Sequence, residues 1–194
     1  ISVPRLYEKM YARVMERVRS VRADISPHDS ARRLADEYGV DVFLGGGQLS
    51  GPDTLEVGGA TLRFERAVIA TGARATVPPI PGLVEAGFLT NETVFNLTEL
   101  PRRLAVLGGG PIGCELAQSF ARLGAEVTIL EIGAQFLPRE DADAVAVLLD
   151  AFRHDRVEVR LATALKRVER RGGAKLLHLE SDGRANTLEV DQIL

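Results

Sequence analysis

Hydrophobic residues recur at helical spacing over the first 39 positions of the chain. Between residues 5 and 21 the apolar side chains fall on one face, which predicts an amphipathic helix. Ser26, Pro27 and Asp29 resemble a capping box, so we expect a second helix to begin there and to end at Gly39. The apolar face of the first predicted helix consists of Leu6, Met10, Val14, Val18 and Val21.

After the second predicted helix, the pattern changes to the two-residue period of strands. The pattern predicts a short strand at residues 40–44 and a buried strand at residues 67–70. Residues 55–57 and 61–64 predict a hairpin, because two glycines, which favour tight turns, separate them. This region therefore looks like a small sheet with few helices.

The second half of the chain alternates strands and helices, in the order that produces a parallel sheet. An apolar run predicts a buried strand at residues 104–107, residues 127–130 predict a second strand, and residues 157–161 a third parallel strand. Helical patterns between these strands begin at Pro111 and at Asp141. Shorter alternating runs predict a small antiparallel meander at residues 165–168, 176–179 and 188–194.

A glycine-rich loop joins the first of these strands to the helix that follows it. Gly108, Gly110 and Gly113 have the spacing Gly-x-Gly-x-x-Gly, which permits a tight turn, close approach of a pyrophosphate and close packing of the helix. The helix N-terminus would offer free N–H groups to the phosphates. The predicted dinucleotide-binding residues of this loop are Gly108, Gly109, Gly110, Pro111, Ile112 and Gly113.

Glu131 ends the next predicted strand, about 20 residues after the motif, where dinucleotide-binding proteins carry an acidic residue. Its carboxylate could accept hydrogen bonds from a ribose and would repel a 2′-phosphate. We therefore expect NAD(H) rather than NADP(H). An ordinary strand-to-helix turn is the alternative, but the strand, glycines, helix and acidic residue together favour dinucleotide binding.

Composition and charge limit the classes of molecule that we expect this chain to bind. A net charge of −3 argues against a general affinity for nucleic acid or an anionic membrane. The arginines of the first predicted helix could bind nucleic acid. We favour the alternative, that they form a solvent-exposed face of the helix. We expect a cytoplasmic protein, because there is one cysteine, no apparent signal peptide and no apolar run of about 20 residues. Because the sequence begins at Ile1 rather than Met, we also expect a longer polypeptide.

With these motifs in place, the chain resembles the flavin-dependent pyridine nucleotide-disulfide oxidoreductases, the family of glutathione reductase, lipoamide dehydrogenase and mercuric reductase. The segment from Ala67 to Gly72 is similar to the second flavin-domain motif of the family, and Val77 to Gly82 to the exit from that domain. Gly108 to Glu115 is similar to its NAD motif. The segments at residues 22–26 and 89–97 look most like the corresponding segments of mercuric reductase and its close relatives.

The resemblance implies an α/β fold with two parts. Residues 1–100 would form a partial FAD-binding domain, with helices, a β-meander and the Ala-Thr-Gly motif. Residues 101–194 would form a Rossmann-like, doubly wound NAD(P)-binding domain with an appended β-meander, truncated at its C-terminal end. The resemblance implies FAD contacts for Gly47, Ala70, Thr71 and Gly72, and places Glu115 at the junction of flavin and nicotinamide.

Several features of the family are missing from this sequence. It has neither a second glycine motif for flavin nor a Cys-x-x-x-x-Cys redox pair, and none of its histidines is followed by glutamate five residues later. Cys114 is best interpreted as a structural cysteine packed between helix and strand. Pro111 stands where several relatives carry a gating tyrosine.

We therefore expect part of an FAD-dependent oxidoreductase that binds NAD(H) for hydride transfer to flavin, with the redox disulfide and the acid–base histidine outside this chain. The electron acceptor would be a small molecule or a metal ion, the full-length protein a homodimer, and no protein-bound metal is expected. Two alternatives remain: a non-catalytic NAD-binding fragment, and a flavin-dependent NADH reductase of a protein partner that has no redox disulfide.

Overall fold

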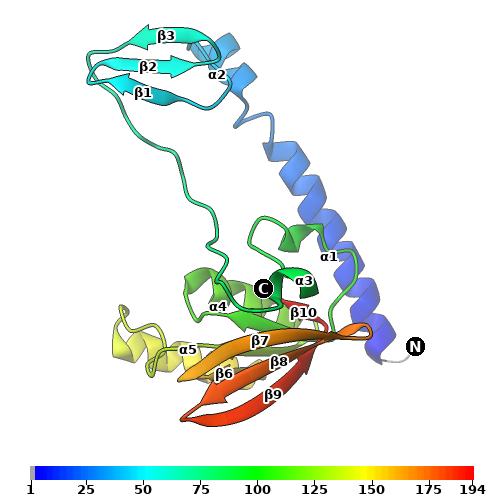
Figure 1. Cartoon of the computed structure of the whole chain (residues 1–194). Coiled ribbons are helices and arrows are strands. Elements are labelled where there is room, and N and C mark those ends of the chain that lie inside the picture. The colour runs from blue at the N-terminus through cyan, green and yellow to red at the C-terminus, as the bar shows by residue number, and fades with distance from the viewer. Residues whose placement is uncertain (1–2) are drawn as a thin grey trace. The chain divides into compact units, whose positions relative to one another are not determined.

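The computed structural model describes residues 3–194, and its elements are drawn in Figure 1. The chain divides into two compact units. One contains the residues up to 18 together with residues 75–194, and the other contains residues 19–74. Residues 75–100 thus belong to the same compact unit as residues 101–194. The predicted α/β fold class is confirmed by the mixture of parallel and antiparallel sheets with helices.

The first unit is built on a four-stranded parallel sheet with the order β10-β4-β5-β6. The predicted strands at residues 104–107, 127–130 and 157–161 are confirmed, with ends shifted by at most one residue. Two helices form the crossovers between neighbouring strands, as predicted. The strands are β4 (Arg103–Leu107), β5 (Glu126–Leu130), β6 (Val157–Arg160) and β10 (Gln192–Ile193), and the helices are α4 (Pro111–Arg122) and α5 (Ala142–His154).

Both faces of the parallel sheet are covered, which explains why its central strands are continuous apolar runs. One face packs on α4 and α5, with Val106 and Ile129 of the sheet and Phe152 of α5 almost fully buried. The opposite face packs on the meander through Ala105, Leu130 and residues of a second cluster. The glycine-rich loop therefore extends from a strand that is fixed on both sides.

The antiparallel meander consists of β7 (Thr163–Arg171), β8 (Ala174–Ser181) and β9 (Arg184–Val190). The prediction of one last strand over residues 188–194 is wrong. The chain leaves the meander after Val190, and β10 then pairs in parallel with β4. Asp191 makes this change of sheet possible, because its carboxylate accepts hydrogen bonds from the backbone N–H and the guanidinium of Arg103 at 2.9 Å each.

Helix α1 (Val3–Ile25) confirms the first predicted helix, but the predicted apolar face is only partly correct, since Val18 and Val21 are half-buried and its other members are exposed. Leu6 and Met10 are 51% and 44% exposed, whereas Tyr11 and Met15 are buried. The ring of Tyr11 lies 6.0 Å from that of Phe120 in α4. Helical spacing shows which side chains share a face of the helix, but it does not decide which of two adjacent faces is buried. Here the buried face is the one that contains the aromatic ring of Tyr11.

The second unit contains α2 (Ala31–Tyr38) and a three-stranded antiparallel sheet of β1 (Gln48–Gly51), β2 (Thr54–Val57) and β3 (Ala60–Arg63). The predicted hairpin at residues 55–64 is confirmed, with Gly58 and Gly59 both at positive φ in the turn. Gly39 ends α2 in the left-handed conformation, as predicted.

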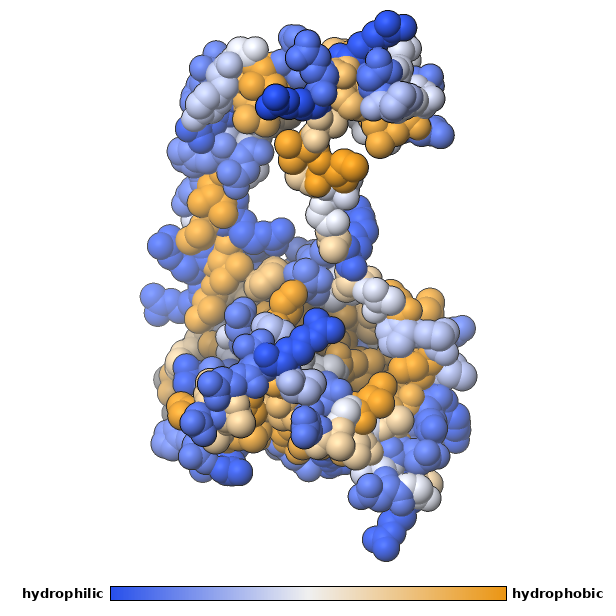
Figure 2. Space-filling model, turned by 90° about the vertical axis from the view of Figure 1, so that its left-hand side faces the viewer, coloured by the Kyte–Doolittle hydropathy of each residue, from blue (hydrophilic) through white to orange (hydrophobic). Residues whose placement is uncertain are grey.

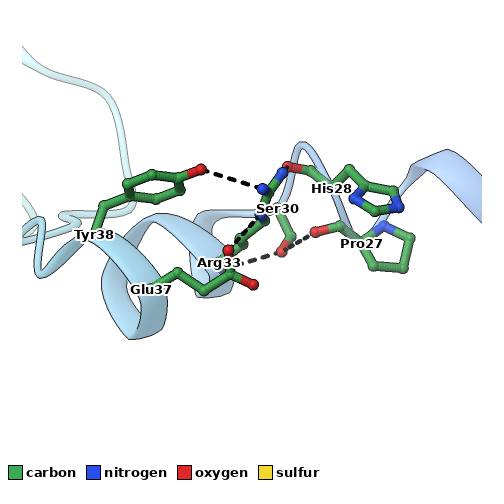
Figure 3. A network of polar contacts seen from close by, with 6 residues as sticks. All are labelled: Pro27, His28, Ser30, Arg33, Glu37 and Tyr38. Carbon is green, nitrogen blue, oxygen red and sulfur yellow. Dashed lines mark hydrogen bonds and ion pairs between the residues drawn. The ribbon is translucent and has the colours of Figure 1, made fainter.

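Helix α2 begins four residues later than the capping pattern predicts (Figure 3). Ser30, not Ser26, is the N-cap, and its hydroxyl accepts a hydrogen bond from the N–H of Arg33 at 3.1 Å. Ser26 still belongs to the end of α1, since its N–H donates to the carbonyl of Arg22. The side chain of Arg33 continues the network, donating to Glu37 and to the hydroxyl of Tyr38 (Figure 3).

The predicted strands at residues 40–44 and 67–70 are not formed. Their side chains are exposed, with Leu44 at 79% and Val68 at 93%, and hydrophobic side chains are visible on the surface of residues 19–74 in Figure 2. A buried strand requires a hydrogen-bonding neighbour and a covered face. Within residues 3–194, neither segment pairs with another strand.

Within the first unit, Pro81 and Gly82 lie against the meander. The carbonyl of Pro81 accepts a hydrogen bond from the N–H of Val168 at 2.9 Å. Gly82 has φ +78°, and a Cβ there would lie 2.0 Å from the carbonyl oxygen of Val168. Two short helices follow, α3 (Leu83–Ala86) and the 3-10 helix η1 (Val94–Asn96). No helix within residues 3–194 is both long and apolar enough to cross a bilayer.

We expect Gly82→Ala to lower the free energy of unfolding much more than Gly172→Ala. Both glycines have positive φ, which costs an alanine about 1 kcal/mol. Only Gly82 adds a collision with backbone, so its total cost should reach about 3 kcal/mol. Urea unfolding followed by circular dichroism measures both variants, and equal losses would contradict the assigned contact.

Cys114 should react slowly with thiol reagents in the folded protein. Its side chain is 5% exposed, and burial raises the pKa of its thiol to about 11. At about pH 8 the thiolate is then roughly one thousandth of the population. Reaction with a chromogenic disulfide should be slow in native buffer and complete within minutes in denaturant. Rapid reaction under native conditions would contradict the buried position.

Candidate functional site

The predicted glycine motif lies at the C-terminal ends of β4 and β5, where α4 begins. Gly108 follows β4 directly and has φ +98°, a conformation that favours glycine. Its N–H donates to the carbonyl of Leu130 at 2.9 Å, so the loop is attached to the end of the neighbouring strand. The chain can therefore turn sharply from β4 into α4.

Gly113 sets how closely α4 lies on the sheet. A Cβ at this position would lie 2.5 Å from the carbonyl oxygen of Gly108 and 3.2 Å from a methyl carbon of Val106. The first of these atoms belongs to the backbone and cannot move away easily. The third glycine of the motif therefore has the packing role that its spacing predicts.

Gly110 is the N-cap of α4, and the space beside it is open. A Cβ there would have no heavy atom within 4 Å, and Gly110 offers no side chain to cap the helix. Pro111 follows at the first helical position, and Ile112 is 57% exposed. This helix end thus presents backbone N–H groups and the positive end of the helix dipole beside an open surface.

Glu131 follows the last residue of β5 and faces the glycine loop. One carboxylate oxygen, Oε2, accepts a hydrogen bond from the N–H of Gly109 at 2.8 Å, and the other, Oε1, accepts from Gly133 at 2.8 Å. The backbone of Glu131 is held between Arg160 and Thr163. A carboxylate offers about four acceptor positions, so these two bonds leave capacity for two hydroxyls of a ribose. The residues of this site therefore fit the adenosine end of a dinucleotide.

Sequence reasoning missed Phe136 and Gly133, which complete the surroundings of Glu131. Phe136 is 5% exposed and packs beside Gly109, and Gly133 holds the second carboxylate oxygen. The one feature of the sequence that could have pointed to these residues was Gly109, a glycine at a motif position that any residue can occupy. Nothing in the spacing connected that glycine to a residue 27 positions later.

Glu115 lies on the second turn of α4 and is exposed. The four residues expected to contact FAD belong to the other compact unit. Gly47, Ala70, Thr71 and Gly72 are all exposed and lie outside helices and strands. Their contact with FAD stays a prediction for the described residues, 3–194. Among the same described residues, no group of three or more histidine, cysteine, aspartate or glutamate side chains could hold a metal ion.

Comparison with known proteins identifies the family of this chain. Residues 6–194 match the family described as pyridine nucleotide-disulphide oxidoreductase. A mercuric reductase of Bacillus cereus is 35% identical over 161 residues, which are 83% of this chain and 26% of that protein. The probable pyridine nucleotide-disulfide oxidoreductase RclA of Escherichia coli (strain K12) is 37% identical over 152 residues, or 76% of this chain and 34% of that protein.

A solved structure of the HOCl-induced flavoprotein disulfide reductase RclA from Escherichia coli has the same fold, with a TM-score of 0.81 and 34% identity. The match covers 94% of this chain and 41% of that structure. The chain thus spans less than half the length of these relatives. Because the family match covers almost the whole chain, the chain belongs to the pyridine nucleotide-disulphide oxidoreductase family.

Proposed function

We propose that this chain provides the NAD(H)-binding part of an FAD-dependent oxidoreductase. The observation that carries the proposal is the arrangement of Gly110 and Glu131: an open backbone at a helix N-terminus beside a carboxylate held by two N–H groups. Bound NADH would supply a hydride to the flavin. The residues of this chain would bind and orient the dinucleotide.

The pyrophosphate would lie over Gly110 and the start of α4. The absence of a side chain at Gly110 would let phosphate oxygens approach the N–H groups of the first helical turn, where the helix dipole favours negative charge. Ile112 and Pro111 would flank the bound cofactor on the same turn. Glu115, one turn further along α4, would face the end of the cofactor that carries the nicotinamide.

Glu131 would select NAD(H) over NADP(H). Its two oxygens are already directed by Gly109 and Gly133, and their remaining lone pairs would accept hydrogen bonds from the ribose hydroxyls. A 2′-phosphate would bring a second negative charge next to the partly buried carboxylate, which is unfavourable.

Flavin binding and the electron acceptor concern the whole polypeptide. We propose that Gly47, Ala70, Thr71 and Gly72 contact FAD only when further protein segments cover residues 40–44 and 67–70. A small-molecule or metal-ion acceptor, a homodimer and a cytoplasmic location stay predictions.

Gly110→Ala should weaken NADH binding by about tenfold or more while leaving the fold intact. The added methyl group would have free space within the protein but would stand where the pyrophosphate approaches. The cost in stability should be about 0.5–1 kcal/mol, from the poorer helix cap. Titration followed by NADH fluorescence measures the affinity.

Gly173→Ala is the matched control for this variant, since Gly173 also has an open surrounding and lies in the turn between β7 and β8. Its NADH affinity should equal that of the wild type. If the wild type shows no saturable NADH binding, the proposed function is wrong. If both glycine variants bind like the wild type, the placement of the pyrophosphate is wrong.

Glu131→Arg should shift the ratio of NADPH to NADH affinity by about tenfold to a hundredfold toward NADPH. The change removes the repulsion and offers a charge-assisted hydrogen bond to the 2′-phosphate, of about 1.5–3 kcal/mol. Glu126→Arg changes the net charge equally at the opposite end of β5, where the residue is exposed, and should leave the ratio unchanged. If the ratio of NADPH to NADH affinity shifts equally in the two variants, the cause is the change in net charge and not the loss of a carboxylate at the ribose site.

A further inference from the structure

Phe136 connects the glycine loop to α5, although the motif does not include it. Its ring is 5% exposed and lies 5.9 Å from the ring of Phe152, in an edge-on arrangement. Phe152 is 1% exposed and belongs to the core beneath the sheet. The position of Phe136 is therefore fixed from the side of α5 by an aromatic contact that favours this geometry.

The other side of the Phe136 ring occupies the space beside Gly109. A Cβ at Gly109 would lie 2.6 Å from Cε2 and 2.9 Å from Cδ2 of that ring. Gly109 is not among the glycines with positive φ, so its backbone conformation suits any residue. The ring of Phe136 is thus the reason that this position, which the motif leaves variable, holds a glycine.

The same glycine donates the hydrogen bond that directs Glu131. The N–H of Gly109 donates to Oε2 of Glu131 at 2.8 Å. A Cβ added to Gly109 would lie 3.4 Å from the same oxygen. A displacement of the Gly109 peptide by the ring would therefore change the direction of the carboxylate. Hydrogen bonds weaken steeply when their geometry departs from linear.

The segment between Glu131 and Phe136 is also attached to the sheet. The carbonyl of Gly133 accepts a hydrogen bond from the N–H of Ala162 at 2.9 Å, while its N–H holds Oε1 of Glu131. Glu131 is thus directed from two sides, by Gly109 under the ring and by Gly133 in the attached segment. In the first contact, a neighbouring side chain, the ring of Phe136, fills the space beside the donor glycine.

We propose that Phe136 is a positioning residue of the dinucleotide site. By filling the space beside Gly109, it holds the Gly109 N–H against Glu131 and so sets the preference for NADH over NADPH. This inference rests on the proposed NAD(H) function and deepens it. It assigns the selectivity for NADH to Glu131 together with Gly109 and Phe136, whose sizes match each other.

A double-mutant cycle in the 194-residue chain tests the pair. The four proteins are the wild type, Gly109→Ala, Phe136→Val and the double variant, and NADH and NADPH affinities are measured for each by fluorescence titration. Each single variant should lower the ratio of NADH to NADPH affinity by about tenfold. In the double variant the methyl group replaces part of the missing ring, so the ratio should return to within about threefold of the wild type.

Phe120→Val is the matched control for Phe136→Val. Phe120 is equally buried, at 5% exposure, and also contacts another aromatic ring, but it lies on the α1 side of the core. Its replacement should lower the melting temperature in a similar way and leave the cofactor ratio unchanged. An unchanged ratio in both single variants, or an equal change in Phe120→Val, would overturn the positioning role.

The amide resonance of Gly109 provides a readout that needs no cofactor. In nitrogen-15 spectra, Phe136→Val should move this resonance in the same direction as Glu131→Gln, whereas Phe120→Val should not move it. An unaltered Gly109 resonance in Phe136→Val would overturn the inference even if NADH binds. If the wild type does not bind NADH, the proposed function fails, and this resonance alone decides whether Phe136 positions Glu131.

Discussion

The close packing of α4 on β4 is the constraint on which the rest of this site depends. Gly113 lies against the carbonyl of Gly108, so the helix can begin immediately after the strand, and its first turn faces the end of β5. A bulkier residue at Gly113 would push the helix axis outward and separate Gly109 from Glu131. The two central strands keep this geometry fixed because both of their faces are buried, which leaves little room for adjustment.

The parts of the fold that the sequence predicted correctly are those whose partners lie nearby along the chain. Strands β4, β5 and β6 follow one another through two crossover helices, and the two central strands, β4 and β5, carry mostly apolar residues. Residues 40–44 and 67–70 carry an equally apolar pattern, yet within residues 3–194 they have no neighbouring strand. Sequence patterns report what a segment could bury, whereas the available partners decide what it does bury.

The candidate site was predictable to the extent that its chemistry is local. Gly108, Gly110, Gly113 and Glu131 are identified by spacing, since a strand, a tight turn and a helix fix their relative positions. Phe136 lies in an irregular segment after β5, where hydrophobic residues follow no period, and its ring contacts Phe152 of α5, which the motif does not include. The change of sheet at Asp191 was missed for the same reason, because its partner Arg103 is 88 residues away.

The four glycines of the loop can be separated by the reason for which each lacks a side chain. Gly108 requires its backbone conformation, Gly109 gives room to a ring, and Gly113 gives room to a carbonyl. These three reasons are internal to the protein. Gly110 has an ordinary φ and an open surrounding, so neither strain nor packing within the described residues requires glycine there. Under the proposed function, a dinucleotide that passes over the start of α4 would supply the missing reason, so Gly110 is the position where ligand binding and fold stability would be separated most cleanly.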